Sequence, residues 1–145
     1  IQTVIALNMF IPMLTGSGGN AGSQASTLVI RAMATQDIEP SDWLKVLIKE
    51  ISVGLICGSI LALAAFLKCY FFDKVAINVA LVVALTIVSI VVIAKAIGSL
   101  LPIIAEKLGA DPAIMASPLI TTIVDSLGLI VYFNIAQMIL PGLGV

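Results

Sequence analysis

The sequence alternates between long apolar runs and short connections that carry charge or proline. Backbone polar groups surrounded by lipid must be hydrogen-bonded within their own segment, so apolar runs of this length predict helices. A helix of about 20 residues crosses the ~30 Å hydrocarbon core of a bilayer. The pattern therefore predicts an all-α, polytopic membrane protein that forms a single domain, residues 1–145. Its four long membrane segments are expected at residues 1–34, 42–68, 75–107 and 112–140.

Composition supports a membrane location. Hydrophobic residues make up 61% of the chain, its mean hydropathy is +1.22, and only 10% of its residues are charged, against about 25% in soluble domains. We therefore expect membrane lipid as a partner and, since no basic patch is present, no nucleic acid. The chain begins inside an apolar run without an initiator methionine or a charged leader, which indicates a piece of a longer protein. Cys57 and Cys69 are too far apart along one helix to bridge and are expected to be free thiols.

The first segment has an unusually small and polar middle, TGSGGNAGSQAS at residues 15–26. The apolar stretches on either side are each too short to cross the membrane, so one continuous helix is favoured over a loop. Along that helix Gly and Ser recur every four residues, a pattern that lets helix backbones approach closely in lipid. Asn8, Asn20 and Gln24 add side-chain amides, which need partners or water. The segment is expected to line a polar cavity or a symmetric interface, with close packing alone as the alternative.

Asp125 is the single charged residue between Ala113 and Leu140. A carboxylate at membrane depth costs at least ~2.5–3.5 kcal/mol on insertion scales, and such residues mark ion, proton or substrate pathways. The alternative is a packing role, in which Asp125 pairs with Asn20, Gln24 or a partner subunit. On a helix, a stripe of small and polar residues is centred on this carboxylate: Ser117, Thr121, Gly128 and Tyr132.

Basic residues predict how the chain crosses the membrane. Four crossings place both ends of the chain on the same side. The stretches 31–49 and 95–107, on the opposite side, carry five Lys and Arg residues, against two, Lys68 and Lys74, in the remaining connection. The side with five is expected to be cytoplasmic. Lys95, one of the five, is expected to extend its ammonium group to the membrane interface.

The residue types limit the chemistry. The chain has no His, whereas zinc and copper sites use His and Cys ligands, and an intramembrane aspartyl protease needs two carboxylates that share a proton. No Rossmann, P-loop, HExxH or CxxC pattern is present, so we do not expect an enzyme. Hard cations such as Mg²⁺ need only oxygen ligands. In a two-fold dimer, Asp125 would meet its symmetry mate with a cation between the two carboxylates.

Two stretches resemble one known family. PMLTGSGGNAGSQAS, residues 12–26, and ADPAIMASPLITTIVDSLGLIVYF, residues 110–133, are similar in sequence, order and spacing to the membrane domain of MgtE-type magnesium channels. The resemblance implies a homodimer with a magnesium pore at the two-fold interface. The family's second and fifth membrane helices line that pore, and they correspond to the first and fourth segments here. The family's first helix and its cytoplasmic magnesium-sensing and CBS domains are expected to be missing from this chain, so gating by cytoplasmic Mg²⁺ is not assigned to these residues.

The resemblance also implies roles for individual residues. Asp125 matches the pore carboxylate that binds the metal, with Thr121 one turn earlier as a carbonyl contributor and Ser117 two turns earlier. Some members of the family carry Asn at the position of Ser117. Together with the small-residue pattern, the resemblance predicts a set of pore-lining residues: Pro12, Gly18, Gly19, Asn20, Gly22, Gln24 and Gly128.

The expected function is transport of Mg²⁺, the transported ion rather than a resident cofactor, across a bacterial cell membrane. A dimeric pore would conduct the hydrated cation, which Asp125 would recognise. Because Mg²⁺ carries two charges, a 100 mV potential supplies ~4.6 kcal/mol for its entry, which is sufficient for a channel. A carrier that couples Mg²⁺ to sodium or protons is the alternative, since the resemblance extends to certain eukaryotic magnesium solute carriers. A membrane scaffold subunit that transports nothing is a third possibility.

Overall fold

The computed structural model describes residues 2–115 and 118–140, and the regular structure in these ranges is helical throughout. The predicted all-α class is therefore confirmed. The polar middle of the first segment belongs to one continuous helix of 33 residues, as predicted. The elements are α1 (Gln2–Ala34), the 3₁₀ turn η1 (Pro40–Asp42), α2 (Trp43–Leu67), the π-helical turn η2 (Lys68–Phe72), α3 (Ile77–Lys107), the 3₁₀ turn η3 (Pro112–Met115) and α4 (Pro118–Ile139).

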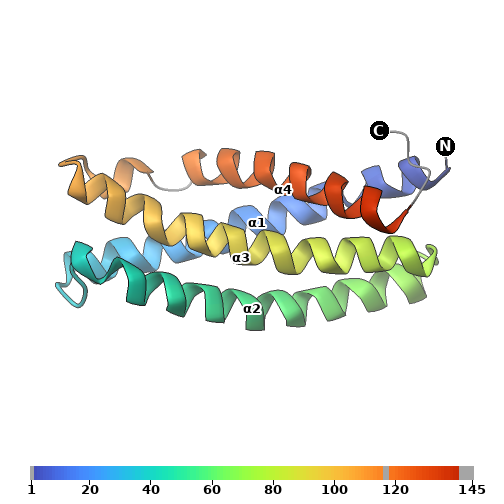
Figure 1. Ribbon diagram of the computed structural model, residues 1–145, viewed down its shortest axis with the longest axis horizontal. Helices are drawn as coiled ribbons and strands as arrows, with labels where there is room; N and C mark the ends of the chain where they lie inside the picture. The colour runs from blue at the N-terminus through green and yellow to red at the C-terminus, as the bar shows by residue number, and fades with distance from the viewer. Residues whose placement is uncertain (1, 116–117, 141–145) are drawn as a thin grey trace.

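The four long helices run antiparallel in chain order, so both chain ends lie at the same end of the bundle (Figure 1). We call this the outer end, and the opposite end, which carries η1 and η3, the inner end. Helix α3 lies in the middle of the bundle and contacts α1, α2 and α4. The position of each other helix therefore depends on its contact with α3.

Three helical stretches in the described ranges are long and apolar enough to cross a membrane: Pro40–Phe72, Ile77–Lys107 and Pro118–Ile139. The chain is accordingly a multi-pass membrane protein. Helix α1 has the length for a crossing, but its small and polar middle makes it less apolar than the other three. Its crossing of the membrane therefore stays a prediction, as does the homodimer.

Helix α2 packs against α3 through small residues. A methyl group added to Gly54 would lie 3.1 Å from Val92 Cα, and one added to Gly58 would lie 3.2 Å from Val88 Cα. The glycines thus let the two backbones approach closely. The opposite side of α2 exposes large apolar side chains, as a surface in contact with lipid requires. These include Leu55, Ile56, Ile60, Leu61 and Leu63.

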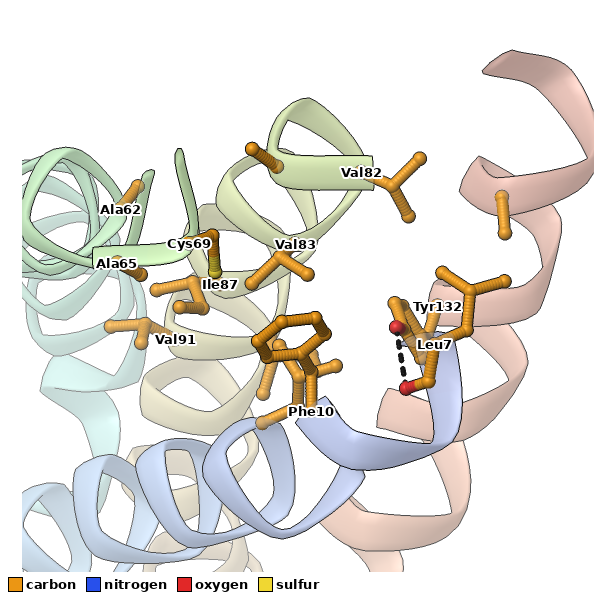
Figure 2. Packing of buried hydrophobic residues seen from close by; sticks show 14 of the residues in the cluster. Leu7, Phe10, Ala62, Ala65, Cys69, Val82, Val83, Ile87, Val91 and Tyr132 are labelled. Carbon is orange, nitrogen blue, oxygen red and sulfur yellow. Dashed lines mark hydrogen bonds between the residues drawn. The ribbon is translucent and has the colours of Figure 1, made fainter. Parts of the chain in front are cut away.

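The outer half of the bundle holds a cluster of buried apolar side chains from several elements. Phe10 comes from α1, Cys69 from η2, Val83 and Ile87 from α3, and Tyr132 from α4 (Figure 2). These side chains come from segments that are distant in the sequence. The cluster therefore joins all parts of the outer half into one packed unit.

The turn η2 contacts α1 through the charged side chain of Lys68 as well as through apolar packing. Lys68 Nζ lies 2.6 Å from Asp73 Oδ2 and 6.0 Å from the centroid of the Phe10 ring. The ammonium group therefore contacts both a carboxylate and the face of an aromatic ring. Cys57 and Cys69 are both free thiols, as predicted.

The prediction that Lys95 reaches the membrane interface is wrong. Its side chain is 7% exposed, and Nζ lies 3.2 Å from Oε2 of Glu50, whose side chain is 4% exposed. A buried ammonium group needs such a partner, because an unpaired charge in this setting costs several kcal/mol. Gly54 on α2 leaves room for the Lys95 stem. Without Lys95 the basic residues number four against two, so the inner end remains the predicted cytoplasmic side.

Helices α1 and α3 meet at two glycines. A methyl group added to Gly98 would overlap the carbonyl oxygen of Gly22. One added to Gly22 would lie 3.1 Å from the carbonyl oxygen of Ala94 and 2.8 Å from Ile120 Cγ2. Residues with a Cβ atom at these positions would push the helices apart.

Replacing Gly98 by Ala should destabilise the bundle, because the new methyl group must displace the backbone of α1 rather than a flexible side chain. Overpacking of this kind typically costs ~1–3 kcal/mol. Gly16→Ala is the matched control, since nothing lies within 4 Å of a methyl group added there. Thermal unfolding in detergent, followed by circular dichroism, measures both variants. Equal midpoints for Gly98→Ala and Gly16→Ala would contradict the contact between backbones.

Candidate cation-binding site

Asp125 lies in the inner half of α4, and its side chain is partly buried. The Oδ1 atom is buried and accepts no hydrogen bond from the residues that the structure describes. Among the ion pairs formed within residues 2–115 and 118–140, none includes Asp125. Asn20 and Gln24, the amides considered as partners within the chain, are exposed on α1 and do not bond this oxygen. The oxygen therefore requires a donor or a cation from outside these helices.

Helix α1 positions the face of α4 that carries Asp125. A methyl group added to Gly19 would lie 3.1 Å from Thr121 Cγ2, and one added to Gly18 would lie 2.8 Å from Val124 Cγ1. Thr121 precedes Asp125 by one helical turn, so the two side chains share one face of α4. Asp125 therefore lies on the side of α4 that packs against α1.

The hydroxyl groups near Asp125 are satisfied within their own helices. Thr121 and Thr122 each donate to the carbonyl oxygen of Pro118, at 3.0 and 2.9 Å. Ser126 donates to the carbonyl oxygen of Thr122 at 2.9 Å. On α1, Ser17 donates one turn back in the same way at 2.7 Å. Because each hydroxyl proton is used, these oxygens have only lone pairs left and can act only as acceptors.

The structure divides the predicted pore-lining residues between two environments. Three are exposed on α1: Pro12, Asn20 and Gln24. Four are buried between helices of the same chain: Gly18, Gly19, Gly22 and Gly128. Gly128 faces Ile90, which also faces Gly18, so these glycines provide close packing inside the subunit. Ser117, predicted as a metal ligand, lies outside the described residues.

The exposed side of α1 carries a shallow, open groove of about 480 Å³, lined mostly by residues with polar side chains. Helix α4 also exposes polar side chains, namely Thr122, Ser126 and Asn134. The α4 side chains donate to carbonyl oxygens of their own helix, whereas side-chain amides that face lipid without a partner are costly, so the exposed amides of α1 call for a polar neighbour or water. The groove on α1 is lined by Asn20, Ser23, Gln24, Thr27 and Leu28.

Near Asp125, this side chain is the one carboxylate available as a metal ligand. Across the described ranges, no three His, Cys, Asp or Glu side chains come together in a way that could hold a metal ion. A cation at Asp125 would therefore complete its shell with carbonyl or hydroxyl oxygens, water, or groups from a second chain. Such a donor set suits a hard cation that retains its water.

Two polar contacts were not predicted from the sequence. One is the buried pair of Glu50 and Lys95, and the other is the hydrogen bond that Tyr132 donates to the carbonyl oxygen of Leu7 at 2.9 Å. Tyr132 stands seven positions after Asp125, on the stripe that the sequence does show. The opposite charges of Glu50 and Lys95, on helices expected to be antiparallel neighbours, were the available signal for the ion pair.

The antiparallel bundle and its long apolar helices define a multi-pass helical membrane protein. Comparison with known sequences identifies the family of this membrane protein. The sequence profile of MgtE, described as a divalent cation transporter, matches residues 11–135. The chain belongs to the MgtE family of divalent cation transporters, as its two motifs predicted.

Curated relatives carry the name "Magnesium transporter MgtE". The chain is 39% identical over 140 residues to the protein of that name from Thermus thermophilus, an alignment that covers 97% of this chain and 31% of the relative. The chain is 32% identical over 132 residues to the Enterococcus faecalis protein, an alignment that covers 91% of this chain and 29% of the relative. The chain is 31% identical over 143 residues to the Bacillus subtilis protein, an alignment that covers 99% of this chain and 32% of the relative. The chain thus spans about a third of the length of these relatives.

Proposed function

We propose that two copies of this chain form a pore that conducts hydrated Mg²⁺ across the membrane, with Asp125 as the group that recognises the cation. The observation that carries the proposal is the buried Oδ1 atom of Asp125, which has no hydrogen-bond partner among residues 2–115 and 118–140. The name of the relatives, magnesium transporter, supports the choice of ion.

The lack of a partner for Asp125 favours a cation over a packing role. A carboxylate at membrane depth costs at least ~2.5–3.5 kcal/mol, and a structural carboxylate offsets this cost through donors within the protein. Glu50 does so, because it pairs with Lys95. The hydroxyl groups of Thr121 and Thr122, on the same helix as Asp125, donate elsewhere. A cation, or the water molecules around it, would supply the missing positive partner.

The available oxygens suit a cation that keeps its water. Mg²⁺ releases water reluctantly and usually binds to proteins through one or two carboxylates. The water molecules around Mg²⁺ donate hydrogen bonds, so they need acceptors. Asp125 and the hydroxyl oxygens of Thr122 and Ser126 are acceptors, because both hydroxyl protons are already used. The acceptor oxygens near Asp125 therefore match the hydrogen-bond donors on the surface of a hydrated ion.

The exposed amides of α1 support a two-fold assembly. In a lipid environment the amides of Asn20 and Gln24 would otherwise remain without polar neighbours. A second copy related by a two-fold axis would present the same face and enclose a polar path between the subunits. The groove on α1 would then face this path, while the apolar side of α2 faces lipid.

Replacing Asp125 by Asn should abolish Mg²⁺ transport while leaving the fold intact, because the side chains are nearly isosteric and only the charge is lost. The measurement is Mg²⁺ influx into liposomes that contain the purified chain and a magnesium-sensitive dye. Asp37→Asn, on the exposed connection before η1, is the control and should transport normally. Influx through Asp125→Asn at the rate of the unmodified chain would refute Asp125 as the recognition group.

Cobalt hexammine should compete with Mg²⁺ for the path. It resembles hydrated Mg²⁺ in size and donor groups but does not exchange its ligands, so it can bind only through its outer surface. Inhibition of influx should weaken as the Mg²⁺ concentration is raised. Absence of competition at concentrations comparable to Mg²⁺ would instead indicate a dehydrated site in which carboxylate oxygens coordinate the metal directly.

Cross-linking should place α1 at the interface between two copies. In a chain with Cys57 and Cys69 replaced by Ala, we expect Asn20→Cys to form a covalent dimer with a short thiol reagent. Ile60→Cys, on the exposed apolar side of α2, should remain monomeric under the same conditions. Cross-linking at Ile60→Cys but not at Asn20→Cys would place the interface on α2 and contradict the proposed pore.

A further inference from the structure

The longest-range side-chain hydrogen bond found in the described ranges joins α4 to α1. The phenol of Tyr132, which is fully buried, donates to the carbonyl oxygen of Leu7 at 2.9 Å across 125 positions of sequence (Figure 2). The carbonyl group of Leu7 belongs to the backbone, so the bond positions the helix itself rather than a mobile side chain. Tyr132 therefore determines how closely the outer part of α1 lies to α4.

The part of α1 that Tyr132 holds precedes a weak point in the helix. Pro12 lies within α1, where it removes the N–H group that would bond the carbonyl oxygen of Asn8, and its ring crowds that carbonyl. Helices bend most readily at such positions. The residues before Pro12 are thus less rigidly coupled to the rest of α1, and the bond from Tyr132 fixes their position.

Asp125 lies between two contacts that set the distance from α1 to α4. On its inner side, Gly19 packs against Thr121. On its outer side, Tyr132 bonds Leu7. Thr121, Asp125 and Tyr132 share one face of α4, since a spacing of seven residues departs from two full turns by only ~20°. The inner contact is glycine packing, whereas the outer one adds a hydroxyl-to-carbonyl hydrogen bond to the apolar packing of Leu7 and Phe10.

We propose that Tyr132 is a positioning residue for cation recognition: its hydroxyl group fixes how α4 packs against α1 and so the place of Asp125 on the wall of the path between the two subunits. This inference rests on the proposed function of Asp125. The place of Asp125 determines how far its carboxylate reaches into the path, and this distance discriminates ions that differ in hydrated size and rigidity, such as Mg²⁺ and Ca²⁺. Loss of the hydroxyl group leaves the charge of Asp125 in place and loosens the spacing around it.

Tyr132→Phe tests the proposal, because it removes the hydroxyl group and retains the ring. The measurements are the Mg²⁺ concentration that gives half-maximal influx into liposomes, and the concentration of Ca²⁺ that halves this influx. We expect the ratio of the two to change by roughly twofold to tenfold, the factor that corresponds to one net hydrogen bond. Tyr70→Phe, at an exposed position on η2, is the matched control and should leave the ratio unchanged.

A purely structural role would give a different result. Loss of packing would lower the amount of folded protein and the maximal influx, but it would leave the half-maximal Mg²⁺ concentration and the Ca²⁺ ratio unaltered. That outcome for Tyr132→Phe would overturn the inference.

The double variant Pro12→Ala, Tyr132→Phe is a second test, because restoring the N–H group at residue 12 stiffens α1. The ratio should return toward that of Pro12→Ala alone, and a ratio that stays shifted would contradict the role of the weak point at Pro12.

The failure of this inference can be told apart from failure of the proposed function. If the unmodified chain carries no Mg²⁺, or if Asp125→Asn transports normally, the proposed function fails. If both behave as expected and Tyr132→Phe keeps the half-maximal concentration and the ratio of the unmodified chain, Asp125 recognises the cation without help from Tyr132.

Discussion

The carbonyl oxygen of Gly22 lies against Gly98, and this contact sets the distance between α1 and α3. Lipid is as apolar as the side chains it surrounds, so helices in a membrane associate mainly through close packing and hydrogen bonds rather than through the hydrophobic effect. Because α3 also contacts α4, the same contact determines where α1 meets α4. A wider separation would remove Gly18 from Val124 and Gly19 from Thr121, the contacts that hold the face carrying Asp125 next to α1.

Two carboxylates in the bundle illustrate two ways of placing charge in a membrane. Glu50 is almost fully buried and pairs with Lys95, so its charge is compensated within the chain. Asp125 has a buried oxygen without a protein partner, and the hydroxyl groups of its helix donate to backbone carbonyl oxygens instead. The first arrangement joins α2 to α3, whereas the second is the one on which the proposed recognition of a cation rests.

The small residues of α1 act on two sides of the helix. Glycines on its buried side allow contact with α3 and α4, and they place the backbone of α1 within reach of Thr121 and Tyr132. The exposed side carries the amides of Asn20 and Gln24 and forms a groove. Close packing therefore occupies one side of α1 and exposed polar side chains the other, and the lining of a cavity or interface by the exposed side stays a prediction.

The sequence by itself determined the class of fold, the continuity of α1, the carboxylate at membrane depth and the family. These properties depend on local patterns, because hydropathy and helical periodicity are set by neighbouring residues. The motifs around Gly19 and Asp125 were sufficient to predict the MgtE family, which the match over residues 11–135 confirms.

Only the tertiary structure decided which side of α1 is buried, where Lys95 finds its partner and what Tyr132 bonds. The contact of Lys95 with Glu50 spans 45 positions, and that of Tyr132 with Leu7 spans 125. Helical periodicity states which residues share a face, but it does not state which helix that face meets. The position of Lys95 along α3 predicts that its ammonium group reaches the membrane interface. The carboxylate that compensates its charge, Glu50, lies on α2, so the sequence of α3 alone does not show it.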